Sequence, residues 1–202
     1  MNICIAGWYY RPEFMTAIRK SGYDAMVVQH REGNTHGIPA MLYDNMGLEF
    51  GAYRKYVEHH WDGSSDVLFI HDDMEILDQS GLRSIETLGG LGVDQAYIFP
   101  DEIHEMVNGG AHGRAIWMSG QIIQKLAGDF PADMSNAGVH IGVVAQLGIL
   151  KFHEAVMRVS RNAGVIAIVP QLRFGHRGRI HEQMFVYRKA GSIPGGLVHV
   201  SE

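Results

Sequence analysis

The sequence has few of the features that define several common protein classes. Its single cysteine, Cys4, excludes an intramolecular disulfide and any metal cluster built from cysteines. Basic residues are in the minority, with 17 Lys and Arg against 22 Asp and Glu, which argues against a general nucleic-acid binder. No apolar run is long enough to span a bilayer, and Met1–Gly7 lacks the pattern of a signal peptide. We therefore expect a cytoplasmic protein with no transmembrane segment.

The chain does contain a regular alternation of strand-like and helix-like segments. Apolar runs that predict buried strands are Asn2–Ala6, Asp24–Gln29, Val67–Ile70, Ala96–Phe99 and Val165–Val169. Helical spacing of apolar residues predicts helices from Pro12 to Gly22 and over residues 49–61, 82–88, 122–126 and 142–161. This alternation predicts one Rossmann-like α/β domain over residues 1–202, with a mostly parallel sheet and helices on both faces.

Polar residues follow several of the predicted strands directly. In open α/β sheets, ligands bind outside the carboxyl ends of the strands. The segments to consider are therefore residues 8–11, 30–32, 71–75 and 101–105.

The segment His71-Asp72-Asp73-Met74-Glu75 concentrates carboxylates at the end of an apolar strand. Carboxylates this close repel one another and favour a compensating cation, and Mg²⁺ and Mn²⁺ prefer such oxygen ligands. If the strand alternation continues past Ile70, Asp73 and Glu75 point to one side and Asp72 points to the other. We predict Asp73 as the first metal ligand. The alternative is a surface turn whose acidic residues cap a helix.

The same segment resembles the aspartate-motif region of glycosyltransferases with the GT-A fold, in particular family-2-like sequences. In those enzymes an apolar strand runs into an Asp-x-Asp-type motif that holds a metal on the nucleotide diphosphate, whereas Phe69-Ile-His-Asp-Asp73 has His at the first motif position. The upstream run from Asn45 to Tyr53 is similar to the Asn-x-Gly-x-Asp/Glu segment that precedes the motif strand. The resemblance covers the N-terminal half better than the C-terminal half. It implies a GT-A-like fold, a nucleotide-diphosphate sugar as donor and Mn²⁺ or Mg²⁺ as cofactor.

The resemblance assigns roles to further residues in the N-terminal half. Trp8 and Tyr9 would stack on the base, Arg11 would contact a phosphate, and Asn45 and Gly47 would lie near the ribose or diphosphate. Asp72 would bind a ribose hydroxyl or a metal-bound water, and Glu75 would join Asp73 on the metal. The alternatives are aromatics that pack the sheet edge, a solvated arginine, and a tight turn at Asn45 and Gly47.

In the C-terminal half the resemblance implies a region near the donor sugar and acceptor, a catalytic base and a late metal ligand. Trp117, Ser119 and Gly120 match the first, in a glycine-rich segment that we interpret as too flexible for a core. Asp133 is the candidate base that deprotonates the acceptor hydroxyl, with Asp101-Glu102 as a second option and a helix cap as the alternative. His176 is the candidate metal ligand, and an ordinary basic loop is the alternative there.

The predicted function is a metal-dependent, inverting glycosyl transfer from a nucleotide-diphosphate sugar to a hydroxyl of an unidentified glycan or other acceptor. A metal-dependent hydrolase is an alternative because the chain has 12 histidines, although it lacks a His-Glu-x-x-His pattern. A non-catalytic nucleotide-binding module with the same fold is a third option. The apolar, glycine-rich segment from Ala190 to Val200 is a candidate surface for a homo-oligomer.

Overall fold

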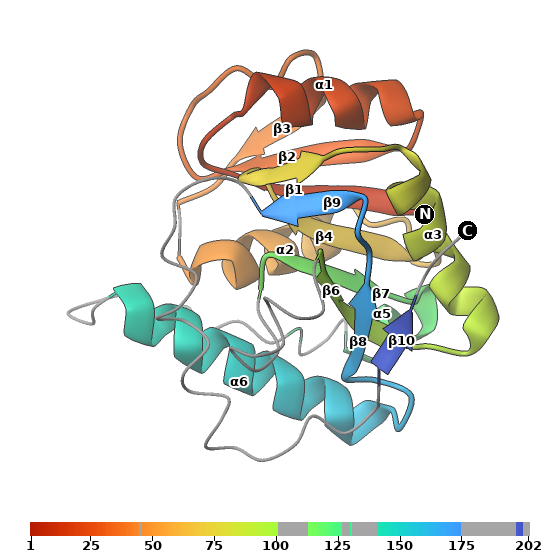
Figure 1. Ribbon diagram of the computed structural model, residues 1–202. Helices are drawn as coiled ribbons and strands as arrows, with labels where there is room; N and C mark the ends of the chain where they lie inside the picture. Colours follow the sequence, from red (N-terminus) through yellow and green to blue (C-terminus); the bar gives the residue numbers. More distant parts are fainter. Residues whose placement is uncertain (45, 101–112, 127–129, 131–140, 175–196, 200–202) are drawn as a thin grey trace.

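The computed structural model describes residues 1–44, 46–100, 113–126, 130, 141–174 and 197–199 (Figure 1). In the N-terminal half the elements are β1 (Asn2–Gly7), α1 (Pro12–Ser21), β2 (Ala25–Gln29), β3 (Ala40–Leu42), α2 (Leu48–His59), β4 (Val67–His71), β5 (Met74–Ile76), α3 (Ser80–Glu86), the short 3-10 helix η1 (Thr87–Leu91) and β6 (Gln95–Phe99). They are followed by β7 (Ala115–Met118), α5 (Gly120–Leu126), α6 (Ile141–Val159), β8 (Val165–Ile168), β9 (Leu172–Phe174) and β10 (Leu197–His199).

Within the described residues, eight strands form the main sheet, in the order β10-β8-β6-β7-β4-β1-β2-β3. Seven of them run in the same direction, and only β7 is antiparallel to its neighbours β4 and β6. A separate antiparallel pair is made by β5 and β9. The predicted α/β class with a mostly parallel sheet is confirmed.

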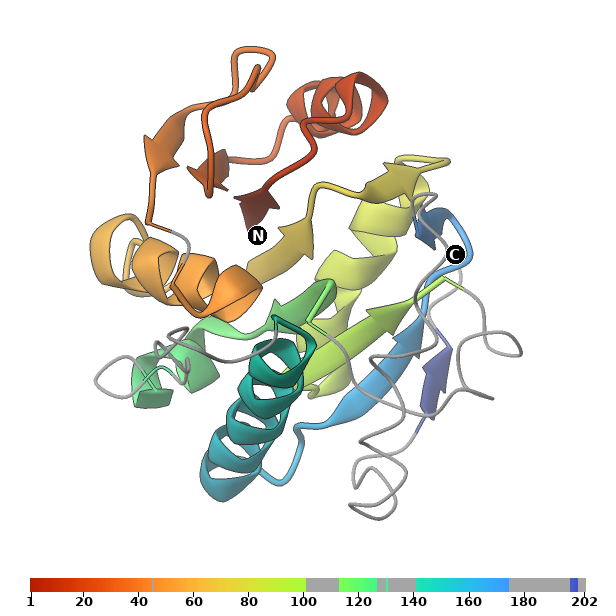
Figure 2. The same cartoon turned by 90° about the vertical axis from the view of Figure 1, so that its left-hand side faces the viewer.

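Helices cover both faces of the sheet, as predicted (Figure 2). Alternate residues of each central strand point to opposite faces: Cys4 and Phe69 pack with α2, α5 and α6, whereas Ile5 and Leu68 pack with α1 and α3. Strands buried on both faces explain the uninterrupted apolar runs in the sequence. In α1, Pro12 occupies the first turn and Gly22 ends the helix in the left-handed conformation at φ 79°.

The structure corrects one prediction about the segment from Arg114 to Gly120. The sequence suggested a segment too flexible for a core, but Ala115–Met118 forms β7, which is completely buried between β4 and β6. The apolar run Ala-Ile-Trp-Met is short and lies next to glycines, so the sequence did not predict a strand there. It forms a strand because it pairs with β4 on one side and with β6 on the other.

The strand order reverses between β1 and β4. From β1 the chain proceeds outward to β2 and β3, whereas β4 pairs with the other side of β1. In open α/β sheets this reversal creates the crevice in which ligands bind, at the carboxyl ends of the strands. The loops after β1 and β4 therefore lie where a ligand is expected to bind. Within the described part of the chain, no helix has the length and apolarity required to cross a membrane.

Candidate ligand-binding site at the β1–β4 edge

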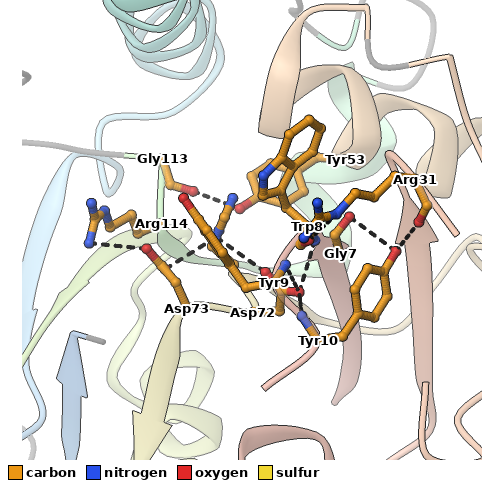
Figure 3. Close-up of polar contacts among 11 residues, drawn as sticks. Gly7, Trp8, Tyr9, Tyr10, Arg31, Tyr53, Asp72, Asp73, Gly113 and Arg114 are labelled. Carbon is orange, nitrogen blue, oxygen red and sulfur yellow. Dashed lines mark hydrogen bonds and ion pairs between the residues drawn. The ribbon is translucent and has the colours of Figure 1, made fainter. Parts of the chain in front are cut away.

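Asp72 joins the loops that follow β1 and β4. Its Oδ2 accepts hydrogen bonds from the backbone N–H groups of Trp8, Tyr9 and Tyr10, at 2.8, 2.7 and 2.6 Å (Figure 3). The Asp72 side chain is completely buried, and within the described part of the chain its Oδ1 has no hydrogen-bond partner. Burial raises the pKa of this carboxyl, while His71 and the three N–H donors act in the opposite direction. Asp72 thus fixes the conformation of the β1 loop.

The β1 loop is also held from the side of β2. Tyr10 has a positive φ of 56°, an unusual conformation for a residue with a side chain, and its hydroxyl donates to the backbone carbonyls of Gly7 and Arg31. The Arg31 guanidinium lies 5.1 Å from the Trp8 ring centre, and its Nε donates to the Trp8 carbonyl at 2.7 Å. Residues that follow β2 and β4 therefore hold the loop after β1, which carries the Trp8 and Tyr9 side chains.

Asp73 lies next to Asp72 but faces different partners. Its Oδ1 is 3.1 Å from His71 Nδ1, and its Oδ2 is 3.4 Å from Arg114 Nη1. Strand β4 ends at His71 and a turn follows, so the strand alternation assumed from the sequence does not extend to Asp73 and Glu75. Next to Arg114, the Tyr53 hydroxyl donates a hydrogen bond to the Gly113 carbonyl at 2.6 Å.

The pKa of His71 is strongly shifted by its neighbours. Burial lowers its pKa, but the Asp73, Asp72 and Glu49 carboxylates outweigh burial and raise the pKa from 6.5 to about 9. Glu49, on α2, has a pKa that burial raises and that the charges of His71 and Arg114 lower. Three carboxyl groups, from Asp73, Asp72 and Glu49, thus interact with the basic side chain of His71, and Arg114 acts on Asp73 and Glu49.

The charge on His71 predicts a dependence of stability on pH. Because its pKa is higher in the folded protein, its stabilising contribution is fully present below pH 6.5 and is lost as the pH rises through about 9. His71→Gln is therefore expected to reduce the free energy of unfolding more below pH 6.5 than above pH 9, as measured by urea denaturation. The exposed His60→Gln is the control. A loss for His71→Gln that is equal at both ends of the range would contradict this assignment of charge.

The aromatic side chains that the sequence singled out are partly accessible. Tyr9 is 42% exposed and its ring lies 5.9 Å from that of His71, while Trp8 is half-buried against His30 at 6.3 Å. His30 was not assigned a role from the sequence, although it follows β2 directly. Burial, and then the charge of His71, lowers its pKa to about 4, so its ring is neutral at pH 7. Its Nδ1 is buried, and none of the described residues forms a hydrogen bond with it.

Glu75 binds two arginines from distant segments. Arg11, at the N-terminus of α1, contacts Glu75 Oε1 through Nη2, and Arg173, on β9, contacts Oε2 through both Nε and Nη2. These contacts lower the pKa of the Glu75 carboxyl, Arg11 having the largest effect. Pairing of β5 with β9 brings Glu75 opposite Arg173. The partner Arg173 was not identified from the sequence, because only the β5–β9 pairing reveals it.

The described residues do not fit the predicted divalent-metal site. Within residues 1–44, 46–100, 113–126, 130, 141–174 and 197–199, no three His, Cys, Asp or Glu side chains are arranged to hold a metal ion. Both oxygens of Asp73 and both oxygens of Glu75 face protein cations instead. The predicted ligand His176 lies outside the described residues, as do Asp133 and Asn45.

Trp117, Ser119 and Gly120 lie apart from the carboxyl ends of β1 and β4. Because β7 runs antiparallel, Trp117 and Met118 pair with Leu68 and Val67 at the start of β4, not with its end at His71. Trp117 is completely buried, and the N–H groups of Ser119 and Gly120 donate to the Asp94 carbonyl and to Asp66 Oδ1. The structure therefore does not bring Trp117, Ser119 and Gly120 to Asp73. Gly47 precedes α2 in the left-handed conformation, at φ 79°.

Comparison with known proteins does not assign this site. No protein-family model matches the chain, and no curated protein matches it. The geometry and the chemistry of the side chains are therefore the basis for a functional proposal.

Proposed function

We propose that this protein is a glycosyltransferase with a GT-A-like fold, which binds a nucleotide-diphosphate sugar at the carboxyl edge of β1 and β4. The observation that carries the proposal is the junction made by Asp72, which fixes the loop of Trp8 and Tyr9 beside the acidic motif of β4. This junction lies at the reversal of strand order, where sheets of this class bind ligands. The sequence motif that resembles glycosyltransferases thus coincides with the position that the topology favours.

The side chains at this edge suggest a division of roles. Tyr9, with 42% of its surface exposed, offers a ring face to a base or a sugar. Arg11 offers a guanidinium to phosphate, since guanidinium groups match phosphate geometry through paired N–H donors. Asp73 and His71 stand between these groups and β7, where they would contact the ribose or the donor sugar.

Titration calorimetry with a panel of nucleoside diphosphates, in the presence and absence of Mn²⁺, tests the proposal. We expect binding of at least one of them, and we expect Asp73→Ala to weaken it by about tenfold, which corresponds to about 1.4 kcal/mol. Asp24→Asn is the control, because this exposed carboxylate precedes β2 and so lies at the amino ends of the strands, away from the candidate site. If no nucleoside diphosphate binds under either condition, the proposal is refuted. If the Asp73 variant binds with the wild-type affinity, only the role of Asp73 is refuted.

A non-catalytic nucleotide-binding module is a second candidate, favoured by a specific observation. The three carboxyl groups of the motif, Asp72, Asp73 and Glu75, contact backbone N–H groups or basic side chains of the protein. Each is therefore occupied by a protein partner and poorly placed to accept a proton from an acceptor hydroxyl. Release of the nucleoside diphosphate from a nucleotide sugar, with and without an added hydroxyl acceptor, separates the candidates. A transferase increases the release when the acceptor is added, a hydrolase releases without it, and a binding module does neither.

A further inference from the structure

Two arginines share a single carboxylate beside the candidate site, which leaves an excess of positive charge. Arg11, Glu75 and Arg173 carry a formal net charge of +1 at neutral pH, from two guanidinium groups and one carboxylate. Their side chains are 28%, 17% and 57% exposed, so a ligand can reach the group from solvent. Two like charges held by one carboxylate favour a further anion.

The hydrogen bonding of Arg11 also points to a missing partner. Its Nη2 contacts Glu75, but its Nη1 is buried and has no hydrogen-bond partner among the residues that the structure describes. A buried guanidinium nitrogen without an acceptor is unfavourable and requires an explanation, such as a bound ion or ligand. The Arg11 side chain is 28% exposed, so a small rotation of its guanidinium would present this nitrogen to a phosphate oxygen, which accepts short, charge-assisted hydrogen bonds.

The surrounding backbone supports the same conclusion. Arg11 is the residue that precedes α1, a helix of 10 residues, and its own side chain does not cap the N–H groups of the first turn. Helix N-termini attract anions through these N–H groups and the helix dipole. The β5–β9 pair holds Arg173 opposite Glu75, and α1 packs against β5, so both guanidinium groups sit on ordered elements.

We infer that Arg11 and Arg173, held by Glu75, form an anion site that binds the diphosphate group of the ligand without a divalent metal. Glu75 is then a positioning residue for two guanidinium groups and not a metal ligand. This inference deepens the proposed function and rests on it for the identity of the ligand. The binding of a diphosphate by these arginines is testable independently.

Inorganic pyrophosphate in a buffer with EDTA is the direct probe, measured by titration calorimetry on the full chain. The wild-type protein is expected to bind it. Arg11→Gln and Arg173→Gln should each weaken binding by about tenfold or more, since each removes a charge-assisted contact worth about 1.4 kcal/mol or more. Arg54→Gln removes the same charge from an exposed ion pair on α2 and should leave the affinity unchanged.

Glu75→Gln distinguishes the anion site from a metal site. It removes a negative charge that competes with the ligand and keeps an amide oxygen that can accept from a guanidinium, so pyrophosphate should bind in EDTA at least as tightly as to the wild type. If Glu75 is a metal ligand, pyrophosphate will bind only with Mn²⁺, and Glu75→Gln will abolish that binding. That result would overturn the inference, and so would an absence of pyrophosphate binding under both conditions.

The proposed function and this inference can fail separately. If pyrophosphate binds in EDTA but no nucleoside diphosphate binds, the anion site stands and the nucleotide-sugar proposal fails. If a nucleoside diphosphate binds with an affinity that Arg11→Gln and Arg173→Gln do not change, the anion site fails and the proposed function stands. Thermal denaturation of each variant checks that it is folded.

Discussion

Replacing Asp72 with alanine is expected to reduce the free energy of unfolding by about 3 kcal/mol, near the lower end of the cost of breaking a buried charged interaction. The substitution leaves the N–H groups of Trp8, Tyr9 and Tyr10, now bonded to Oδ2 at 2.6 to 2.8 Å, without their acceptor. A hydrogen bond to a charged group contributes roughly 1.5–3 kcal/mol, but relief from burying the carboxylate offsets part of the loss. The loop after β1 should become less ordered, and the whole fold should become less stable.

Urea denaturation followed by circular dichroism measures this change. Asp72→Asn serves as the graded variant, because it keeps an oxygen acceptor of the same size and removes the charge, so its loss should be smaller. Asp78→Ala is the control, since that carboxylate accepts a single backbone N–H, from Ser80 at 2.7 Å, at the exposed start of α3. A reduction for Asp72→Ala of less than about 1 kcal/mol, the size of one ordinary hydrogen bond, would show that Asp72 does not hold the loop.

The longer buried strands were predictable from the sequence, whereas the short ones were not. The strands at residues 2–7 and 67–71 are mostly apolar because both of their faces are covered, and this pattern is visible in the sequence itself. β3, β5, β9 and β10 have 3 residues each, too few to show any periodicity. They exist because a neighbouring strand pairs with them, and the sequence does not show that neighbour.

The location of the candidate site was predictable for the same reason, but its electrostatics were not. Strand ends indicated the edge at which residues 8–11 and 71–75 meet. The repulsion among the carboxylates suggested a metal, whereas in the fold Arg114 and Arg173 supply compensating charge from distant segments. Because β7 runs antiparallel to β4, Trp117 lies beside the start of β4 and not beside its end, which no local pattern indicates.

Gly120, predicted from the sequence as a ligand-binding residue, is expected to matter for packing instead. A Cβ at this position would lie 1.8 Å from the Ser64 carbonyl oxygen and 2.7 Å from the Ser64 carbonyl carbon. No Cβ tolerates such contacts, and the obstacle is backbone, which cannot rotate away as a side chain can. Gly120→Ala would push the start of α5 away from the segment that precedes β4, and it would strain the hydrogen bond from the Gly120 N–H to Asp66 Oδ1 at 2.8 Å.

We expect Gly120→Ala to lower the free energy of unfolding by about 3 kcal/mol, at the upper end of the usual cost of overpacking. Gly90→Ala is the matched control, because a Cβ there meets no atom within 4 Å, and its effect should stay within about 0.5 kcal/mol. Both variants are compared with the wild type by urea denaturation, and the folded fraction of each is titrated with the ligand found by calorimetry. Packing predicts a large loss of stability for Gly120→Ala with the affinity retained. A stable Gly120→Ala protein that no longer binds would instead place Gly120 in the ligand site. That result would contradict the structure, in which α5 begins beside the start of β4, at the end of the strand away from the candidate site.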